Sequence, residues 1–201
     1  MSFIIPDSEL DIKLLSESYN LLSFSCNDAD LNNFLKDDAL NDQKIMINKT
    51  NLCFYKNELV GYITLLNDTI GTKEVIVKDA IETKYKKYPA MKIARLAVDS
   101  KYEKRGIGKY LLYAAIGKAL SISDSVGCRF VLVDSKKESI TFYEKFGFKK
   151  AILKKKYMKD NYTPMYFDLQ PVIREINAGM QISGNVKIEN ITNRNKVQDG
   201  N

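Results

Sequence analysis

The sequence of 201 residues contains no histidine. Without histidine, the Ser-His-Asp and Cys-His catalytic pairings and most zinc sites are excluded. Any proton transfer must therefore use tyrosine, aspartate, glutamate, lysine, cysteine or water. We accordingly expect an active site, if there is one, that works without a metal.

Cysteines and long apolar runs are also scarce. Cys26, Cys53 and Cys128 are odd in number and lack the spacing of metal ligands, so we expect core cysteines in a reducing setting. No run approaches the roughly 18 apolar residues of a membrane helix. The N-terminal "MSFIIPDSEL" lacks the basic and apolar segments of a signal peptide. These features predict a cytoplasmic protein without membrane contact.

Charge is unevenly distributed along the chain. Residues 1–50 carry a net charge of −5 and the remainder +11, which gives the total of +6. Lysines gather at Lys84, Lys86 and Lys87, from Lys101 to Lys109, and from Lys149 to Lys159. One interpretation is a solvated surface that keeps the protein soluble. The other is a polyanionic ligand, either a phosphorylated cofactor or a nucleic acid.

Hydrophobic periodicity predicts an α/β fold with a mixed sheet. We expect a helix over about 28–44, capped by Asn27 or Asp28, and a hairpin around residues 56–58. A lysine-rich connection over 71–90 ends at Pro89 and leads to the strand "MKIARLAVD". Next along the chain we expect a helix with an apolar stripe from Leu111 to Leu120 and then the strand "CRFVLVD". The last elements are a short helix closed by Gly147 and the strands "FKKAILKK" and "TPMYFDL".

Apolar content falls near the C-terminus, which suggests a domain boundary. We predict one domain over residues 1–170 and an appendage over 171–201. The appendage is expected to be partly ordered, with one short strand near "NVKIENI".

Two glycines stand where the strand "ARLAVD" gives way to a helix, within "EKRGIGK". A helix N-terminus presents free N–H groups and a partial positive charge. Gly106 and Gly108 remove the Cβ atoms that would hold a phosphate away, and glycine permits unusual backbone angles. Lys104, Arg105 and Lys109 add positive charge. The spacing is neither that of a P-loop nor that of the dinucleotide fingerprint. The segment predicts a pyrophosphate cradle, although many helix starts with two glycines bind nothing.

Two motifs resemble those of the GNAT N-acetyltransferase family. The family pattern Gln/Arg-x-x-Gly-x-Gly/Ala corresponds to Glu103-Lys104-Arg105-Gly106-Ile107-Gly108, with Glu103 at the first position. The second motif is "ITFYEKFGFKK", and the resemblance covers about residues 1–170. It implies a mostly antiparallel mixed sheet, splayed between its central strands and flanked by helices.

The GNAT resemblance also implies acetyl-coenzyme A (acetyl-CoA) as cosubstrate. Its pantetheine arm would pair with the strand edge at Leu96, Ala97 and Val98. Its pyrophosphate would lie on residues 104–109. Tyr143 would protonate the departing thiolate, as a tyrosine at this position does in many members. The alternative for Tyr143 is a packing role between helix and sheet, which Phe142 and Phe146 could also fill.

The segments "FSCNDADLNNFLKDDAL", "LCFYKNELVGYITL" and "ARLAVDSKYEKRGIGKYLL" resemble the acetyltransferase toxins of bacterial toxin–antitoxin pairs. This resemblance implies acetylation of the α-amine of an aminoacyl-tRNA, a ribbon-helix-helix antitoxin as partner, and a homodimer. The basic charge agrees with a tRNA substrate. An α-amine has a pKa near 8, so it needs little base, which suits a chain without histidine. The candidate contacts to the acceptor stem are Arg95, Lys84, Lys86, Lys87, Lys154 and Lys155.

Two other classes remain open at this point. One is an acetyltransferase for a small amine, a protein N-terminus or a lysine, without an antitoxin. The other is a non-catalytic module that binds CoA or nucleic acid. Thioester turnover with any amine acceptor separates the enzymes from the binding module.

Overall fold

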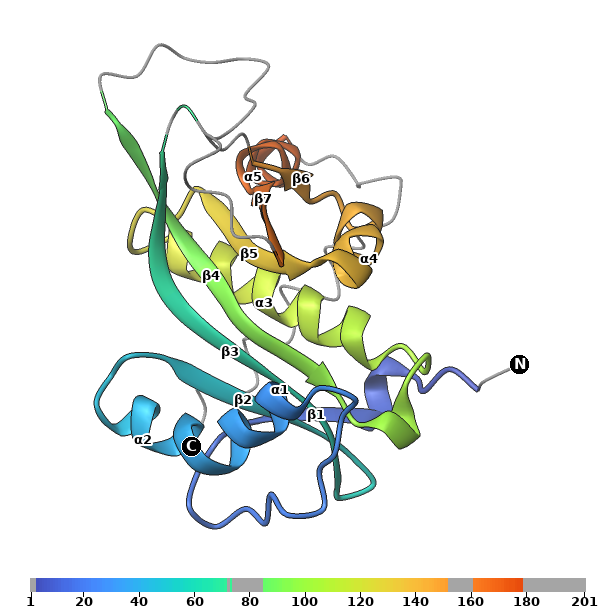
Figure 1. Cartoon of the computed structure of the whole chain (residues 1–201). Coiled ribbons are helices and arrows are strands. Elements are labelled where there is room, and N and C mark those ends of the chain that lie inside the picture. Colours follow the sequence, from blue (N-terminus) through green and yellow to red (C-terminus); the bar gives the residue numbers. More distant parts are fainter. Residues whose placement is uncertain (1–2, 72, 74–84, 152–160, 179–201) are drawn as a thin grey trace. The chain divides into compact units, whose positions relative to one another are not determined.

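The computed structural model describes residues 3–71, 73, 85–151 and 161–178. Its strands are β1 Leu10–Leu14, β2 Lys49–Tyr55, β3 Glu58–Gly71, β4 Lys87–Val98, β5 Phe130–Lys136, β6 Lys149–Lys150 and β7 Tyr162–Asp168 (Figure 1). Its α-helices are α1 Ala29–Asn33, α2 Ala39–Lys44, α3 Ile107–Ser123, α4 Ile140–Lys145 and α5 Gln170–Asn177. A π-helix, η2 Phe34–Asp38, joins α1 to α2, and the 3₁₀-helices are η1 Asp7–Glu9, η3 Ser100–Tyr102 and η4 Lys137–Ser139.

The seven strands are hydrogen-bonded in the order β1-β2-β3-β4-β5-β7-β6. The pairs β1/β2, β2/β3, β5/β7 and β6/β7 are antiparallel. The predicted α/β fold with a mostly antiparallel sheet is therefore confirmed. The predicted splay between central strands stays a prediction.

The chain forms two compact units. Unit 1 comprises residues 1–66 and 93–115, and unit 2 comprises residues 67–92 and 116–201. The strands β3 and β4 and the helix α3 each contribute residues to both units. Among the residues that the structure describes, no helix is long and apolar enough to cross a bilayer.

Unit 1 has a core in which the helical run 29–44 packs beside strand residues. The core includes Leu15, Phe24, Phe34, Leu35, Ala39, Leu52, Leu59, Tyr62 and Ala97. Asp28 caps the run, because its carboxylate accepts the backbone N–H groups of Asp30 and Leu31. The predicted helix over 28–44 is thus confirmed, but its middle is π-helical, which the periodicity does not indicate.

The hairpin between β2 and β3 turns on two residues. Lys56 and Asn57 have φ values of 48° and 67°, both in the left-handed region. Two positive φ values at the central residues are those of a type I′ turn, whose twist matches that of paired strands. The predicted hairpin around residues 56–58 is confirmed.

Unit 2 has its own apolar cluster, formed by Ile70, Ala90, Phe130, Leu132 and Tyr166. A paired arginine and aspartate join the residue before β5 to the end of β7. Arg129 donates from Nε and Nη2 to the two carboxylate oxygens of Asp168, at 2.8 and 2.9 Å. Gly147 has a φ of 86° just after α4, as expected of the residue that closes this helix.

One expectation differs from the structure, and two elements were not expected. The connection that was predicted to end at Pro89 ends earlier, because β4 begins at Lys87 and contains Pro89. β1 and α5 were not predicted from the sequence patterns. The strand expected near "NVKIENI" and most of the strand expected in "FKKAILKK" lie outside the described residues and stay predictions. In the described part of "FKKAILKK", Lys149–Lys150 forms β6.

Candidate functional site

The segment between β4 and α3 is held in place by a buried carboxylate. Asp99 is 4% exposed and its two oxygens accept the backbone N–H groups of Ser25 and Lys101, each at 2.9 Å. The N–H of Asp99 donates to the carbonyl of Val60, and that of Ser100 to Ser25. A single side chain thus ties β4, the segment before α1 and the start of η3 together. Sequence analysis did not single out Asp99, although an aspartate that precedes a turn is a capping signal.

Three further contacts brace the same segment within unit 1. The Tyr102 hydroxyl donates to the Glu58 carboxylate at 2.7 Å. Glu103 accepts a hydrogen bond from the Asn27 side chain at 2.8 Å. The carbonyl of Arg105 accepts the N–H of Ile5 at 3.0 Å. Residues 99–105 therefore have partners on three distant parts of unit 1: the N-terminal segment at Ile5, the segment 25–27, and β3.

The turn into α3 uses two left-handed residues. Lys104 has a φ of 59° and Gly106 a φ of 94°. A Cβ on Gly106 would also lie 3.3 Å from Cγ2 of Ile4. Gly106 is therefore required by its backbone angle, and a Cβ at this position would also require the Ile4 side chain to shift slightly. Gly108 lies in the first turn of α3 and does not share the positive φ.

The N-terminus of α3 begins directly after this turn. Its first internal hydrogen bond runs from Tyr110 N to the Gly106 carbonyl at 3.0 Å. The N–H groups of Ile107, Gly108 and Lys109 consequently have no acceptor within the helix. Together with the helix dipole they form a place for an anion.

The charged side chains at this turn lie against aromatic rings. The guanidinium carbon of Arg105 is 5.2 Å from the centre of the Tyr102 ring, and Lys109 Nζ is 5.5 Å from that of Tyr113. Such contacts restrict the side chains without neutralising their charge. The geometry fits the predicted cradle for a pyrophosphate.

The end of β4 carries the residues predicted to meet the pantetheine arm. Leu96 and Val98 are partly exposed, whereas Ala97 is 4% exposed. A Cβ on Gly61 would lie 3.0 Å from the Ala97 carbonyl and 3.1 Å from α3 side chains. Gly61 therefore allows β3, β4 and the start of α3 to pack closely.

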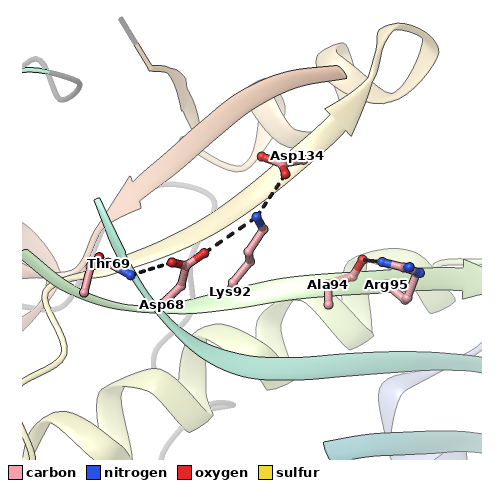
Figure 2. A network of polar contacts seen from close by, with 6 residues as sticks. All are labelled: Asp68, Thr69, Lys92, Ala94, Arg95 and Asp134. Carbon is pink, nitrogen blue, oxygen red and sulfur yellow. Dashed lines mark hydrogen bonds and ion pairs between the residues drawn. The ribbon is translucent and has the colours of Figure 1, made fainter. Parts of the chain in front are cut away.

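Arg95 and Lys92 are two cations on β4 with different surroundings (Figure 2). Lys92 Nζ lies 2.9 Å from Asp134 and 3.6 Å from Asp68, so its charge is matched by two carboxylates. Arg95 is exposed, donates from Nη1 to the Ala94 carbonyl at 2.8 Å, and has its guanidinium carbon 4.9 Å from the Phe34 ring centre. Among the described residues, no carboxylate pairs with Arg95.

Tyr143 is part of unit 2 and lies on α4, buried at 6% exposure. Its ring makes edge contacts with Phe142 and Phe148, at centroid distances of 5.1 and 5.4 Å. Burial raises the pKa of the Tyr143 hydroxyl to about 12. The side chain is therefore both packed and protonated at neutral pH.

The other predicted substrate contacts are spread unevenly over the described chain. Lys86 and Lys87 are exposed at the start of β4, in unit 2. Lys84, Lys154 and Lys155 lie outside the described residues. Arg95 belongs to unit 1 and is described above.

A model of the acetyltransferase (GNAT) family matches residues 13–148, more than half of the chain. The chain belongs to this family. The predicted family and the predicted acetyltransferase class are thereby confirmed. The matched residues include the turn at Gly106 and Tyr143.

Similar proteins support the narrower resemblance of this GNAT chain to toxins. A tRNA-acetylating toxin of Mycobacterium tuberculosis (strain ATCC 25618 / H37Rv) is 28% identical over 144 residues, which cover 67% of this chain and 81% of that protein. AtaT complexed with acetyl-methionyl-tRNAfMet has a TM-score of 0.74 at 22% identity, covering 83% of this chain and 99% of the other. A mutant AtaT toxin bound to acetyl-CoA and the C-terminus of the antitoxin AtaR has a TM-score of 0.65 at 23% identity, covering 84% and 98%.

Proposed function

We propose that this GNAT chain transfers the acetyl group of acetyl-CoA to the α-amine of an aminoacyl-tRNA. The observation that carries the proposal is the likeness to a tRNA-acetylating toxin over two thirds of the chain. The net charge of +11 beyond residue 50 supports it, because tRNA is a polyanion. Acetylation would block the amine that attacks peptidyl-tRNA, so translation would stall.

The cofactor site of this proposal lies in unit 1. The free N–H groups of Ile107, Gly108 and Lys109 would bind the pyrophosphate of acetyl-CoA, with Lys104 and Arg105 adding charge. Gly106 supports the site by giving the turn its left-handed backbone. The edge of β4 at residues 96–98 would pair with the amides of the pantetheine arm.

The reaction needs one nucleophile and one acid. The neutral α-amine attacks the thioester carbonyl carbon, the new C–N bond forms, and the C–S bond breaks. The amine loses a proton to water, and the thiolate of CoA gains one. Tyr143 is our candidate for the second proton, because its pKa of about 12 keeps the hydroxyl protonated at neutral pH.

Substrate contacts and partners complete the proposal. Arg95, Lys86 and Lys87 are exposed cations, and we propose that they contact the acceptor end of the tRNA. Lys84, Lys154 and Lys155 are proposed for the same role from the sequence alone. A ribbon-helix-helix antitoxin and a second copy of the chain are the proposed protein partners. The proposed compartment is the cytoplasm, where charged tRNA and acetyl-CoA are found.

The direct test is to incubate charged tRNA with labelled acetyl-CoA and then hydrolyse the ester. Label on the released amino acid is the expected result. Label only on protein lysines, protein N-termini or polyamines, with charged tRNA untouched, would assign the enzyme to the other acceptor class. Absence of thioester turnover with every amine would leave only a binding module. Growth arrest on expression, relieved by Tyr143→Phe, is the corresponding result in cells.

A further inference from the structure

Arg95 lies against an aromatic ring that is itself fixed in the core of unit 1. The Phe34 ring is 8% exposed and stacks on Tyr62, with centroids 6.4 Å apart and planes inclined by 24°. Tyr62 is 0% exposed, and its hydroxyl donates to the Leu31 carbonyl at 2.7 Å. Phe34 consequently has little freedom to move, and it offers Arg95 a rigid surface.

The orientation of the guanidinium is set from two sides. The Phe34 ring centre lies 4.9 Å from the central carbon of the guanidinium. Nη1 of Arg95 donates to the Ala94 carbonyl at 2.8 Å, as Figure 2 shows. Arginine ordinarily keeps about 2 kcal/mol of side-chain entropy in solution. An exposed arginine held by a ring and a carbonyl has already lost part of this freedom, so a ligand need not order it.

The charge of Arg95 is not used within the described part of unit 1. Lys92, three residues earlier on β4, is held by two carboxylates, whereas Arg95 has none. A simple phosphate contact does not require a flat, oriented cation, since a lysine serves as well. A fixed guanidinium plane is instead the arrangement on which unpaired nucleobases stack.

The position of Arg95 along β4 identifies which base this would be. It directly precedes Leu96, the first of the three residues proposed to meet the pantetheine arm, and consecutive Cα atoms are about 3.8 Å apart. The amine must reach the thioester at the end of that arm. In an aminoacyl-tRNA, that amine is attached through an ester to the 3′-terminal adenosine, which is single-stranded.

We propose that Arg95, oriented by Phe34, is the stacking platform for the 3′-terminal adenine of the tRNA. The inference rests on the proposed function and refines it, because Arg95 then stacks on a nucleobase and does not only contact a phosphate. Phe34 is a positioning residue that acts through Arg95. Every charged tRNA ends in this adenosine, so the contact would serve all acceptors alike.

The test compares binding of two uncharged tRNAs, one ending in CCA and one lacking the terminal adenosine. The wild-type protein should bind the complete tRNA roughly tenfold more tightly, the scale of one stacked base. Arg95→Lys keeps the charge and removes the plane, so it should bind both tRNAs equally. Arg174→Lys is the matched control at another exposed arginine, and it should keep the preference.

Phe34 is tested by its dependence on Arg95. Phe34→Leu should reduce the preference in the wild-type background and have no further effect on it in Arg95→Lys. If Phe34 had only a structural role, Phe34→Leu would lower the affinity for both tRNAs, and by the same factor in the wild-type and Arg95→Lys backgrounds. Thermal unfolding of each variant identifies any loss of fold, and Phe34→Tyr, which keeps a ring, should retain the preference.

Two results would overturn the inference. One is an Arg95→Lys variant that still prefers the complete tRNA, together with a flatter salt dependence in Arg95→Ala, which assigns Arg95 to a phosphate. The other is a wild-type protein that acetylates charged tRNA yet shows no preference for the terminal adenosine. If the preference is present but charged tRNA is never acetylated, the proposed function fails instead. A protein that binds neither tRNA refutes both.

Discussion

The backbone N–H of Ile5 donates to the carbonyl of Arg105 at 3.0 Å, across 100 positions of sequence. Ile5 is 1% exposed, and the neighbouring Ile4 lies against the space that a side chain on Gly106 would need. The beginning of the described chain is therefore part of the wall that fixes the turn before α3.

Removing this hydrogen bond should weaken acetyl-CoA binding. Ile5→Pro lacks the N–H, so the carbonyl of Arg105 loses its partner and the turn gains freedom; we expect a rise in Kd of about fivefold, equivalent to one net hydrogen bond. Ile5→Ala keeps the N–H and is the control for loss of the side chain. Calorimetric titration measures both. Equal Kd values in the two variants would show that the hydrogen bond does not position the turn.

The two glycines of the turn should respond differently to substitution. Gly106→Ala places an L-residue at a φ of 94°, so the free energy of unfolding should fall by roughly 1–2 kcal/mol. Gly108→Val stands in a helical turn, so the chain should fold, but its branched side chain would block the pyrophosphate. Denaturant unfolding and acetyl-CoA titration separate the two effects. A Gly108→Val variant with intact fold and unchanged affinity would refute the cradle.

Tyr143→Phe removes one hydroxyl and little volume. If Tyr143 is the acid, kcat should fall by roughly 10²-fold, with acetyl-CoA affinity nearly unchanged. Steady-state kinetics measures kcat, and calorimetric titration of the same variant measures the acetyl-CoA affinity. A variant as fast as wild type would assign proton donation to water and leave Tyr143 the packing role that its contacts with Phe142 and Phe148 already describe.

The pH dependence should carry a second signature of Tyr143. The raised pKa of about 12 means that the acid stays protonated through neutral and mildly alkaline pH. Activity should rise as the α-amine deprotonates near pH 8 and then remain level to about pH 10. The same raised pKa favours the folded state below pH 10, and this contribution is lost as the pH rises through 12. A fall in kcat between pH 8 and 10 in a folded protein would contradict the assignment.

The pair Arg129–Asp168 should stabilise unit 2. Both side chains are about one fifth exposed, and Asp168 also accepts the N–H of Gln170 at the start of α5. Asp168→Ala leaves a half-buried arginine without its partner, so we expect the free energy of unfolding to fall by roughly 2 kcal/mol. Exposed Asp37→Ala is the control and should change it little. Comparable losses in both variants would show that the pair contributes nothing specific.

Local sequence patterns were enough to predict the elements that are determined locally. The apolar stripe of α3, the glycine that closes α4 and the two-residue hairpin turn depend on neighbours a few positions away. The sequence also indicated that the two glycines before α3 permit unusual backbone angles, but not that Gly106 alone adopts a positive φ. α5 also had a local signal, Pro171 at its first turn, which the falling apolar content of this region obscured.

What could not be predicted depends on distant partners. β1 has one buried residue, Leu10, and an exposed Leu14, so its pattern is weak and only pairing with β2 makes it a strand. The bracing of residues 99–105 by Ser25, Asn27 and Ile5 joins segments more than 70 positions apart. The contact between Phe34 and Arg95 is of the same kind. Such contacts follow from the fold and leave no periodic signal.

The π-helical segment η2 makes the helical run 29–44 sensitive to its length in single residues. A π-helical turn takes one residue more than an α-helical turn, so loss of the exposed Lys36 would restore a plain α-helix. Every later residue would then rotate by about 100°. Ala39, 0% exposed, would leave the core while Phe34 kept its place. The extra residue in the π-helical turn therefore lets Phe34 face Arg95 while Ala39, in the following helix, still faces the core.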